Sequence, residues 1–387
     1  MRAWALPEYI EDILPVEAAR VERLRRRILD LFRTHGYELV MPPLLEYVES
    51  LLTGTGHDLD LQTFKLVDRL SGRMLGVRAD ITPQVARIDA HLLNRRGVTR
   101  LCYSGSVLHT LPSGMNRTRE PIQIGAELYG HAGIESDVEI QRLLMRVLAA
   151  AGIRRCYLEI GHVAIFRSVI RRGGVRAELE AELFRATQAK DLPTLRGLVR
   201  RLAPKTRKAL MTLPELYGDA GIIAQARKQL PDYPEIRTAL SDLGALSGKL
   251  RDVARIRRFD LAELRGYRYH SGVVFAAYTE GRSNALALGG RYDQVGKAFG
   301  RARTATGFSM DLRELAAAIP DGSARAAVLA PYRPADTVLK SAVEALRTRG
   351  EIVIDDLPGH SGTRGELGCD RRLAKRKGRW VIEELKQ

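Results

Sequence analysis

Hydrophobic residues near the start of the chain recur at three- and four-residue spacing over residues 16–35. The positions concerned are Val21, Leu24, Ile28, Leu31 and Phe32. This spacing predicts an amphipathic helix with one apolar stripe, and Gly36 fits the position just past its end. Residues 37–46 then predict a strand that closes on Pro42 and Pro43. Such a strand favours a sheet edge or an interface, because proline cannot donate to a ladder.

The pattern changes to strict alternation over residues 100–130. Two extended runs, 101–110 and 121–130, are joined by a polar loop that contains Ser113, Gly114, Asn116, Arg117 and Arg119. One side of the second run carries Ile122, Ile124, Ala126 and Leu128. The other side carries Gln123, Glu127 and Tyr129. Period-two patterning with one polar face predicts an antiparallel strand pair between the core and a pocket, although an ordinary hairpin would also explain it.

The remaining patterns divide the chain into parts. Residues 63–68 and 73–80 predict short strands, and Thr82 fits the N-cap of a helix that runs to about Leu93. We predict a core, 1–161 and 258–322, interrupted by a helical insertion at 162–257 that shows no recognisable chemistry. The tail, 323–387, alternates strand and helix patterns, which is typical of a small α/β unit.

Composition supports a globular protein and excludes several other classes. The chain has 387 residues, of which 45% are hydrophobic and 28% charged, enough for two or three domains. No apolar run approaches the ~20 residues that span a bilayer, and no apolar signal core lies near the N-terminus. Cys102, Cys156 and Cys369 are far apart, so we expect no disulfide and no metal site, and a cytoplasmic location.

The net charge of +16 raises the question of nucleic-acid binding. Arginine outnumbers lysine by 51 to 11, and the arginines are spread along the chain rather than gathered in one block. A basic solvated surface, or a surface that meets an acidic partner subunit, explains this distribution at least as well as an RNA groove.

Five stretches together resemble the class II aminoacyl-tRNA synthetases, and within them the histidyl branch. Residues 100–130 resemble motif 2, with QIGAELYG at 123–130 similar to its second strand, and residues 16–46 resemble motif 1. The segments 264–272 and 287–293 resemble the two histidine-specific motifs, and 307–315 occupies the place of motif 3. The resemblance implies an α+β fold, in which an antiparallel sheet flanked by helices carries a helical insertion and a small C-terminal α/β unit.

The resemblance also implies a set of histidine-contacting residues. The matching positions are Asp80, Thr82, Gln123, Glu127, Arg265, Tyr269 and His270. Acidic groups in this set would pair with the ammonium and imidazole of histidine, and Arg265 could meet its carboxylate. His270 stands where the family has tyrosine, and Asp80 stands where it has glutamate.

The arginines that grip ATP in the family have no counterparts at the matching positions. Leu108 stands at the motif 2 arginine, in Val107-Leu108-His109-Thr110. In motif 3 the order is Arg313-Glu314 rather than Glu-Arg, so that Glu314 faces the phosphate side, and Asp311 replaces a small glycine. Losing one transition-state donor costs about 3–4 kcal/mol. We therefore expect the ATP clamp to be lost at Leu108 and Glu314.

A histidyl-type core without an ATP clamp resembles the regulatory subunits of short-form ATP phosphoribosyltransferase. The stretches 107–110, 118–130, 357–360, 369–371 and 378–380 are similar to that family. This resemblance implies a non-catalytic chain that is required for the first step of histidine biosynthesis. It also implies a complex with the short catalytic subunit, and feedback inhibition with histidine as the effector. We further expect a self-dimer through the motif 1-like region, no cofactor, no metal, no membrane contact and no tRNA.

Two alternatives from other classes stay open. An active histidine–tRNA ligase would exchange pyrophosphate into ATP in the presence of histidine. An RNA-binding paralogue would show affinity whose logarithm falls linearly with the logarithm of salt concentration.

Overall fold

The computed structural model describes residues 4–53, 57–112, 118–253, 257–267, 269–319, 327–359 and 365–385. The chain divides into two compact units, Met1–Ile319 and Pro320–Gln387. The predicted boundary between residues 322 and 323 lies outside the described residues. Within these residues, no helix combines the length and apolar character that crossing a membrane requires.

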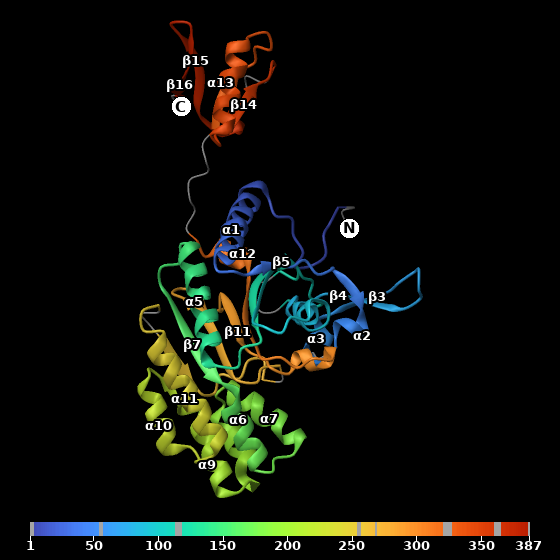
Figure 1. Ribbon diagram of the computed structural model, residues 1–387, viewed down its shortest axis with the longest axis vertical. Helices are drawn as coiled ribbons and strands as arrows, with labels where there is room; N and C mark the ends of the chain where they lie inside the picture. Colours follow the sequence, from blue (N-terminus) through green and yellow to red (C-terminus); the bar gives the residue numbers. More distant parts are fainter. Residues whose placement is uncertain are drawn as a thin grey trace. The chain divides into compact units, whose positions relative to one another are not determined.

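A nine-stranded sheet forms the centre of the first unit (Figure 1). In spatial order its strands are β1 (Glu38–Leu39), β5 (Thr99–Ser106), β6 (Ile122–Tyr129), β12 (Ala305–Asp311), β11 (Ala287–Arg291), β10 (Val273–Thr279), β7 (Cys156–His162), β9 (Arg257–Asp260) and β8 (Tyr217–Gly218). Pairing is antiparallel except at β1–β5 and β7–β9. The expected antiparallel sheet flanked by helices is confirmed.

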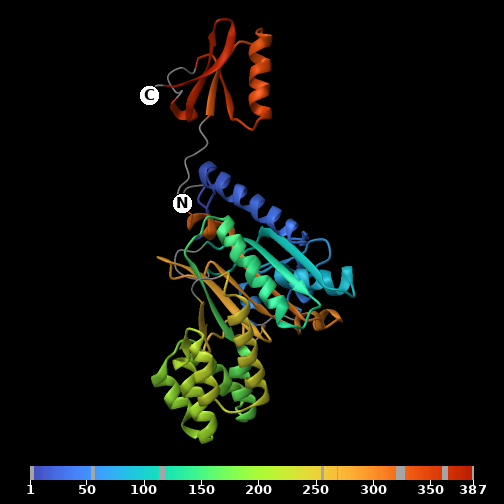
Figure 2. The ribbon, with the colours of Figure 1, turned by 60° about the vertical axis from the view of Figure 1, so that its left-hand side comes forward.

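Helices α1 (Pro15–Thr34) and α5 (Ile134–Ala150) run along one face of this sheet (Figure 2). The predicted N-terminal helix is confirmed, and Gly36 follows it with φ of +79°, a conformation that favours glycine. Ile28 and Phe32 of α1 share one hydrophobic core with Ile140 of α5 and Leu128 of β6. The short helix α12 (Leu312–Ala317) packs beside α1.

The predicted strand over residues 37–46 is only partly present. It is divided into β1 and β2 (Leu45–Tyr47), and the two prolines lie between them without strand pairing. Their carbonyl groups accept side-chain hydrogen bonds, Pro42 from Arg78 at 2.7 Å and Pro43 from Gln84 at 2.8 Å. These contacts satisfy backbone groups that a ladder would otherwise use.

A second, three-stranded sheet lies next to this segment. It joins β2 to β4 (Met74–Val77) and β3 (Phe64–Val67), close to the predicted positions. Three short helices accompany it: α2 (Val48–Leu51), α3 (His57–Gln62) and α4 (Thr82–Arg87). A π-helical segment, η1 (Ile88–Leu93), continues α4 to the residue where the predicted helix ends.

The central strand pair shows the predicted division of faces. Ile124, Ala126 and Leu128 pack in the core beneath α1 and α5, whereas Tyr129 packs in a separate cluster on the opposite face. The first strand ends earlier than predicted, at Ser106 rather than residue 110. Of the connecting loop, residues 113–117 lie outside the described part of the chain.

The insertion is helical, as predicted, apart from the two-residue strand β8. Its α-helices are α6 (Val163–Arg172), α7 (Ala177–Gln188), α8 (Leu192–Leu198), α9 (Pro204–Thr212), α10 (Gly221–Gln229) and α11 (Pro234–Lys249), with 3-10 turns η2 (Val199–Arg201) and η3 (Leu213–Glu215). A further 3-10 turn, η4 (Val295–Phe299), follows β11 in the core. Apolar residues of the insertion helices join the core beneath the nine-stranded sheet, so the insertion packs against this sheet.

The C-terminal unit is a four-stranded sheet with one helix. Its elements are β13 (Ala327–Pro331), α13 (Thr337–Thr348), β14 (Val353–Asp356), β15 (Cys369–Arg376) and β16 (Arg379–Glu384), with spatial order β14-β13-β15-β16. The sequence did not indicate β15, because Leu373 is its one residue in the small hydrophobic core and most of the others are charged.

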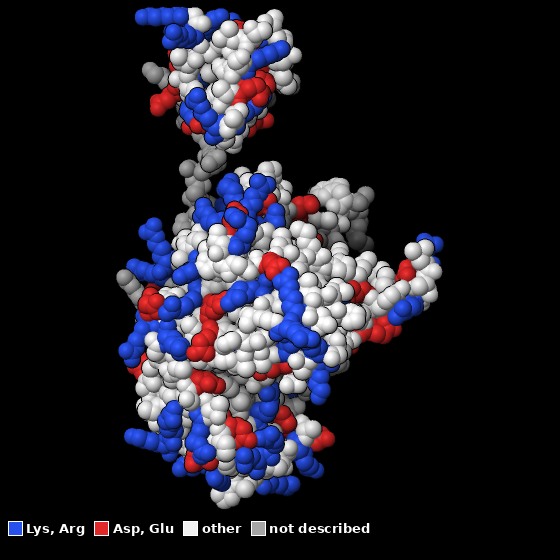
Figure 3. Space-filling view, in the orientation of Figure 1, with Lys and Arg blue, Asp and Glu red and all other residues white. Residues whose placement is uncertain are grey.

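Charged side chains of both signs alternate on the face shown in Figure 3. Many of the arginines are paired: Arg25 and Arg26 bind Glu22, and Arg171 and Arg172 bind Glu235. Pairing of this kind favours a solvated basic surface over a dedicated RNA groove.

The buried ion pair between Asp89 and Arg303 joins η1 to the loop that precedes β12. Nη1 of Arg303 lies 2.7 Å from Asp89 Oδ1, and both side chains are buried. Removing one member leaves the other charge buried and unpaired. We expect Asp89→Ala to lower the free energy of unfolding by about 3–5 kcal/mol in urea titrations. Glu38→Ala, which breaks the exposed pair with Arg95, is the matched control and should change it little.

Candidate functional site

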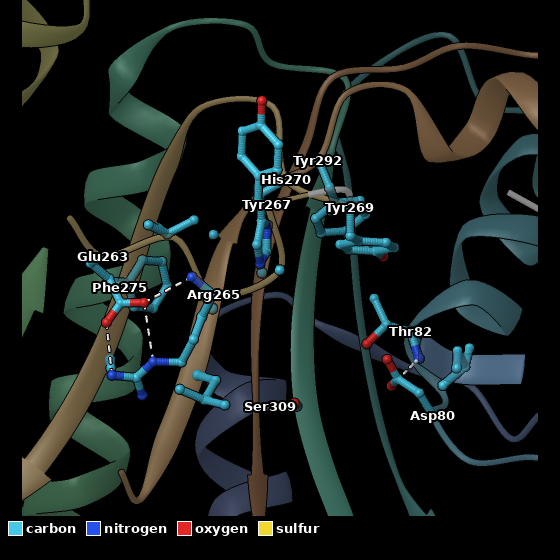
Figure 4. Close-up of a pocket in the computed structure, with 18 of the residues that line it drawn as sticks. Asp80, Thr82, Glu263, Arg265, Tyr267, Tyr269, His270, Phe275, Tyr292 and Ser309 are labelled. Atoms are coloured by element: carbon cyan, nitrogen blue, oxygen red, sulfur yellow. Dashed lines mark hydrogen bonds and ion pairs between the residues drawn. The ribbon is translucent and has the colours of Figure 1, made fainter. Parts of the chain in front are cut away.

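A cavity of about 780 Å³ opens on the sheet face opposite α1 and α5 (Figure 4). Strands β6, β10, β11 and β12 form its floor, residues within 263–267 and 269–270 form one wall, and α4 and α7 approach from the sides. Its volume is in the range typical of small-molecule sites.

Glycines on the floor provide the depth of this cavity. A Cβ atom on Gly307 of β12 would lie 1.5 Å from Oε2 of Glu127, and one on Gly290 of β11 would lie 2.9 Å from Cε1 of the His270 ring. Only glycine lets the neighbouring side chains occupy these places. In the Gly-Gly pair of residues 289–290, Gly290 therefore makes room for a cavity residue, whereas Gly289 faces the core and makes room for Phe275.

Asp80 and Thr82 line one end of the cavity, and Gln123, which lines a smaller adjoining cavity, contacts Asp80 there. Asp80 Oδ1 accepts from Gln123 Nε2 at 2.8 Å and from the Thr82 amide at 3.0 Å. Oε1 of Gln123 accepts from the Ile81 amide at 2.9 Å. These bonds hold the carboxylate and the amide in fixed orientations.

The predicted N-cap role of Thr82 is wrong. Helix α4 begins at Thr82 itself, and Ile81 occupies the cap position without a side-chain cap. The Thr82 hydroxyl instead lies 3.1 Å from the Tyr103 hydroxyl. Asp80, two residues earlier, supplies the side-chain acceptor for the Thr82 amide at 3.0 Å.

Glu127 lies on β6 at the floor of the cavity and is almost completely buried, with 1% of its surface exposed. Its Oε1 accepts from the Tyr103 hydroxyl at 3.1 Å, and its Oε2 accepts from the Tyr292 hydroxyl. Burial raises the pKa of Glu127 to about 8, and the charge of Asp80 adds to the rise. No lysine or arginine among the described residues forms an ion pair with this carboxyl group, so a cationic ligand group would be its natural partner.

Tyr269 and His270 form the upper wall. Their rings meet edge to face with centroids 5.4 Å apart. The Tyr269 hydroxyl and the His270 Nδ1 are buried atoms without a hydrogen-bond partner among the described residues. Burial lowers the pKa of His270 to about 4, so its ring is neutral at pH 7. Both residues line the cavity, and a buried polar atom without a partner gains stability when a ligand supplies one.

Arg265 lies on the opposite side of the cavity from Asp80 and Thr82 (Figure 4). Its guanidinium group is already paired: Nη2 lies 2.7 Å from Glu263 Oε2, and Nε lies 3.1 Å from Glu263 Oε1. Nη2 also donates to the Tyr278 hydroxyl and lies 3.7 Å from Glu159. The cavity thus has a carboxylate end and an arginine end.

Several residues that line the cavity or support its lining were not among the predicted ones. Tyr103 and Tyr292 hold Glu127, and Glu180 of α7 accepts from the Tyr267 hydroxyl at 2.8 Å. Tyr103 lies in the first alternating run, and Tyr292 lies within residues 287–293, which resemble a histidine-specific motif. Both could therefore have been predicted as site residues. The contribution of α7 to the cavity could not have been predicted, because nothing in the sequence of this helix indicates contact with residues so distant in the chain.

A smaller cavity of about 250 Å³ adjoins the first and shares Asp80, Leu288 and Ser309 with it. His109, Asp311 and Glu314 line it as well. None of the described residues that line it is lysine or arginine. Burial raises the pKa of Asp311 to about 6.

The two expected clamp positions differ in their surroundings. Leu108 lines neither cavity, and its amide donates to the Arg78 carbonyl at 3.0 Å. The next residue, His109, lines the small cavity, with Nε2 2.9 Å from the Ala79 carbonyl. Glu314 lines it too and pairs with Arg282 at 3.2 Å.

Arg313 takes part in neither cavity. Its Nη2 lies 2.6 Å from Glu11, and its Nε lies 3.5 Å from Glu17. Through the described part of the chain, no group of three or more histidine, cysteine, aspartate or glutamate side chains is placed to hold a metal ion.

Sequence models of two families match this chain. The one described as histidyl-tRNA synthetase matches residues 9–315, and the one described as ATP phosphoribosyltransferase subunit HisZ C-terminal domain matches residues 325–383. Among solved structures, a Bacillus halodurans protein described as an ATP phosphoribosyltransferase regulatory subunit/histidyl-tRNA synthetase is similar, with a TM-score of 0.83 and 28% identity. The match covers 93% of this chain and 95% of that one. The histidyl-tRNA synthetase of Nostoc sp. shares the fold, with a TM-score of 0.78 at 17% identity, over 99% of this chain and 97% of that one.

Curated relatives extend over nearly the whole chain. The ATP phosphoribosyltransferase regulatory subunit of Nitrosospira multiformis is 57% identical over 99% of both chains, and that of Azoarcus sp. is 58% identical over 99% of both. The regulatory subunit of Ralstonia pickettii is 57% identical over 98% of this chain and 97% of its own length. Together with the histidyl-type core and the matching C-terminal unit, these similarities show that the chain belongs to the family of ATP phosphoribosyltransferase regulatory subunits.

Proposed function

We propose that this chain binds histidine in the large cavity and transmits its presence to a catalytic subunit of ATP phosphoribosyltransferase, without catalysing a reaction itself. The observation that carries this proposal is the contrast between the adjoining cavities. The large one offers fixed groups of both charges to an amino acid, whereas the described lining of the small one has carboxylates and no arginine or lysine.

The large cavity suits a zwitterion that also carries an imidazole. Asp80, with Thr82 and Gln123, can receive the ammonium group, and Arg265 at the far end can meet the carboxylate. Glu127 lies deeper and lacks a cationic partner among the described residues, so it suits the imidazole. Tyr269 and His270 can supply further hydrogen bonds from the wall, because one polar atom of each has no partner in the described structure.

The small cavity is unsuited to a nucleotide triphosphate. Asp311 and Glu314 line it with Asp80, and like charges near 4 Å repel by about 4 kcal/mol at an effective dielectric of 20. His109, the residue after the position of the motif 2 arginine, lines this cavity with an imidazole ring, which lacks the bidentate grip of a guanidinium group. Leu108 and Glu314 supply no donor in its place. The described lining of this cavity therefore does not offer the groups that would hold ATP bent for adenylation.

Assembly rests on two surfaces in this proposal. One meets the short-form catalytic subunit, which carries out the first step of histidine biosynthesis in the cytoplasm. The other makes a self-dimer through the motif 1-like region, where Leu39, Met41, Leu44 and Leu45 are exposed. An apolar patch of this kind is typical of a protein interface. The proposal needs no cofactor, metal, tRNA or membrane.

An active histidine–tRNA ligase is the second candidate, because the histidyl-tRNA synthetase family model spans residues 9–315. Exchange of labelled pyrophosphate into ATP with histidine separates the two functions. We expect no exchange above background. Robust exchange would replace the regulatory proposal with the ligase.

Co-expression with a short-form catalytic subunit tests the proposed partnership. We expect the two chains to co-purify, and phosphoribosyl transfer to ATP to appear when both are present and to fall when histidine is added. Each chain assayed alone is the control. Full activity of the catalytic subunit alone, with the same response to histidine, would contradict the proposal.

Glu127→Gln tests the histidine pocket. The amide keeps the shape of the side chain but cannot carry the negative charge that faces the imidazole, so we expect histidine to bind at least about tenfold more weakly by calorimetry. Inhibition of the complex should weaken in parallel, while co-purification stays intact. Glu235→Gln, in which the lost carboxylate pairs with Arg171 and Arg172 outside the cavity, is the matched control. Unchanged histidine binding in Glu127→Gln would place the effector elsewhere.

The raised pKa of Glu127 also predicts a pH dependence of stability. The folded carboxyl keeps its proton to about pH 8, whereas the unfolded one loses it near its model value of 4.5. The folded state therefore binds more protons between these values, and the free energy of unfolding falls as pH rises through this window. We expect Glu127→Gln to remove that loss, a few kcal/mol by order of magnitude. In urea titrations, the free energy of unfolding of the variant minus that of the wild type should be larger at pH 8 than at pH 5. An equal difference at the two pH values would contradict the prediction.

A further inference from the structure

Arg265 is the one partly buried arginine in the described lining of the large cavity, and it is already neutralised. Glu263 contacts two nitrogens of its guanidinium group and also accepts from the Arg265 amide at 2.9 Å. The Glu263 side chain is 7% exposed and that of Arg265 is 38% exposed. Such a bidentate pair, closed by a two-residue turn, is a strong charge-assisted contact.

A second carboxylate lies on the same guanidinium group. Glu159 of β7 is 3.7 Å from Arg265 Nη2, and the Tyr278 hydroxyl of β10 accepts from the same nitrogen. Asp260 of β9 is nearby but is paired with Lys190 at 2.6 Å. Two carboxylates therefore share one arginine, and a ligand carboxylate would be a third.

The other charged groups of this wall come from α7. Glu180 accepts from the Tyr267 hydroxyl, and Arg185 is exposed at the cavity edge. Neither forms an ion pair with Arg265 or Glu263 among the described residues. The electrostatics at the arginine end are thus set mainly by Glu263 and Glu159.

We propose that Glu263 is a specificity-determining residue that holds down the affinity of Arg265 for a ligand carboxylate, so that the pocket distinguishes only weakly between histidine and an analogue without that group. This inference rests on the proposed function, because it assumes that histidine occupies the cavity. Its physical basis is competition: a guanidinium group that already faces two carboxylates attracts a third one poorly, and the two resident carboxylates repel it.

Proton uptake follows from the same arrangement. Burial, with the charges of Asp260 and Glu263, raises the pKa of Glu159 to about 7. A ligand carboxylate brings another negative charge and favours the protonated form further. Binding of a carboxylate therefore takes up a proton, and it strengthens as pH falls through about 7. Because Glu159 and Glu263 interact, this proton uptake is a property of the two carboxyl groups together.

Calorimetric titration of the full chain with L-histidine and with L-histidinol tests the inference. Histidinol has a hydroxymethyl group in place of the carboxylate and keeps the ammonium and imidazole, so the ratio of the two dissociation constants isolates the carboxylate. In Glu263→Gln we expect this ratio to shift at least about fivefold toward histidine, and histidinol affinity to change little. Arg265→Gln should shift it toward histidinol.

Matched variants separate this inference from general changes in the pocket. Glu180→Gln removes a lining carboxylate that binds a tyrosine rather than an arginine, and should leave the ratio unchanged. Arg185→Gln is the corresponding control for Arg265→Gln. Glu159→Gln, whose side chain resembles the protonated acid, should shift the ratio in the same direction as Glu263→Gln, and it serves as the second test if Glu263→Gln does not fold.

The pH profile supplies an independent readout. In the wild type, the ratio should favour histidine more at pH 6 than at pH 8, and Glu159→Gln should flatten this dependence, because the imidazole titrates in both ligands and cancels. An unchanged ratio in both Glu263→Gln and Glu159→Gln, or a loss of histidine preference in Arg185→Gln rather than Arg265→Gln, would overturn the inference. Wild-type protein that binds neither ligand would instead count against the proposed histidine pocket.

Discussion

The buried carboxyl group of Glu127 constrains the arrangement of the whole site. It lies on a central strand, and a buried polar group of this kind is costly without hydrogen-bond partners. Two tyrosine hydroxyls reach it from β5 and from the end of β11, and Gly307 on β12 leaves the space that it fills. Because any side chain at residue 307 would collide with it, the register of β6 against β12 and the position of Glu127 are mutually dependent.

Around this group the cavity is ordered by charge. Asp80 and Gln123 are fixed to each other at one end, and Arg265 is fixed to Glu263 at the other. Groups that are held before a ligand arrives lose little conformational entropy on binding. The same rigidity has a cost at the arginine end, where the internal partner competes with the ligand. In the proposed regulatory role, this competition favours release of the ligand when its concentration falls.

The residues that match the family's clamp positions show why a resemblance is an incomplete guide to geometry. Arg313 is present in the sequence, yet it binds Glu11 and Glu17 near the N-terminus. His109 lines the small cavity and Leu108 does not, because alternation after β5 sends neighbouring side chains in different directions. Position in a motif predicts which element carries a residue, but one step along the backbone decides which way its side chain points.

Sequence patterns alone determined the periodic features: the α1 stripe, the two faces of β6, and the helical character of the insertion. These follow from local spacing, since a period of 3.6 or 2 fixes which residues share a face. The motifs likewise indicated the histidine-binding set, and the structure brings Asp80, Thr82, Gln123, Glu127, Tyr269 and His270 to the lining or the immediate surroundings of one cavity. Only the tertiary structure decided the pairing of Arg265 with Glu263 and Glu159, the hydroxyls that hold Glu127, and the approach of α7. Those contacts join residues far apart in the chain or depend on side-chain direction, and their energies arise from burial and from charges that no local pattern records.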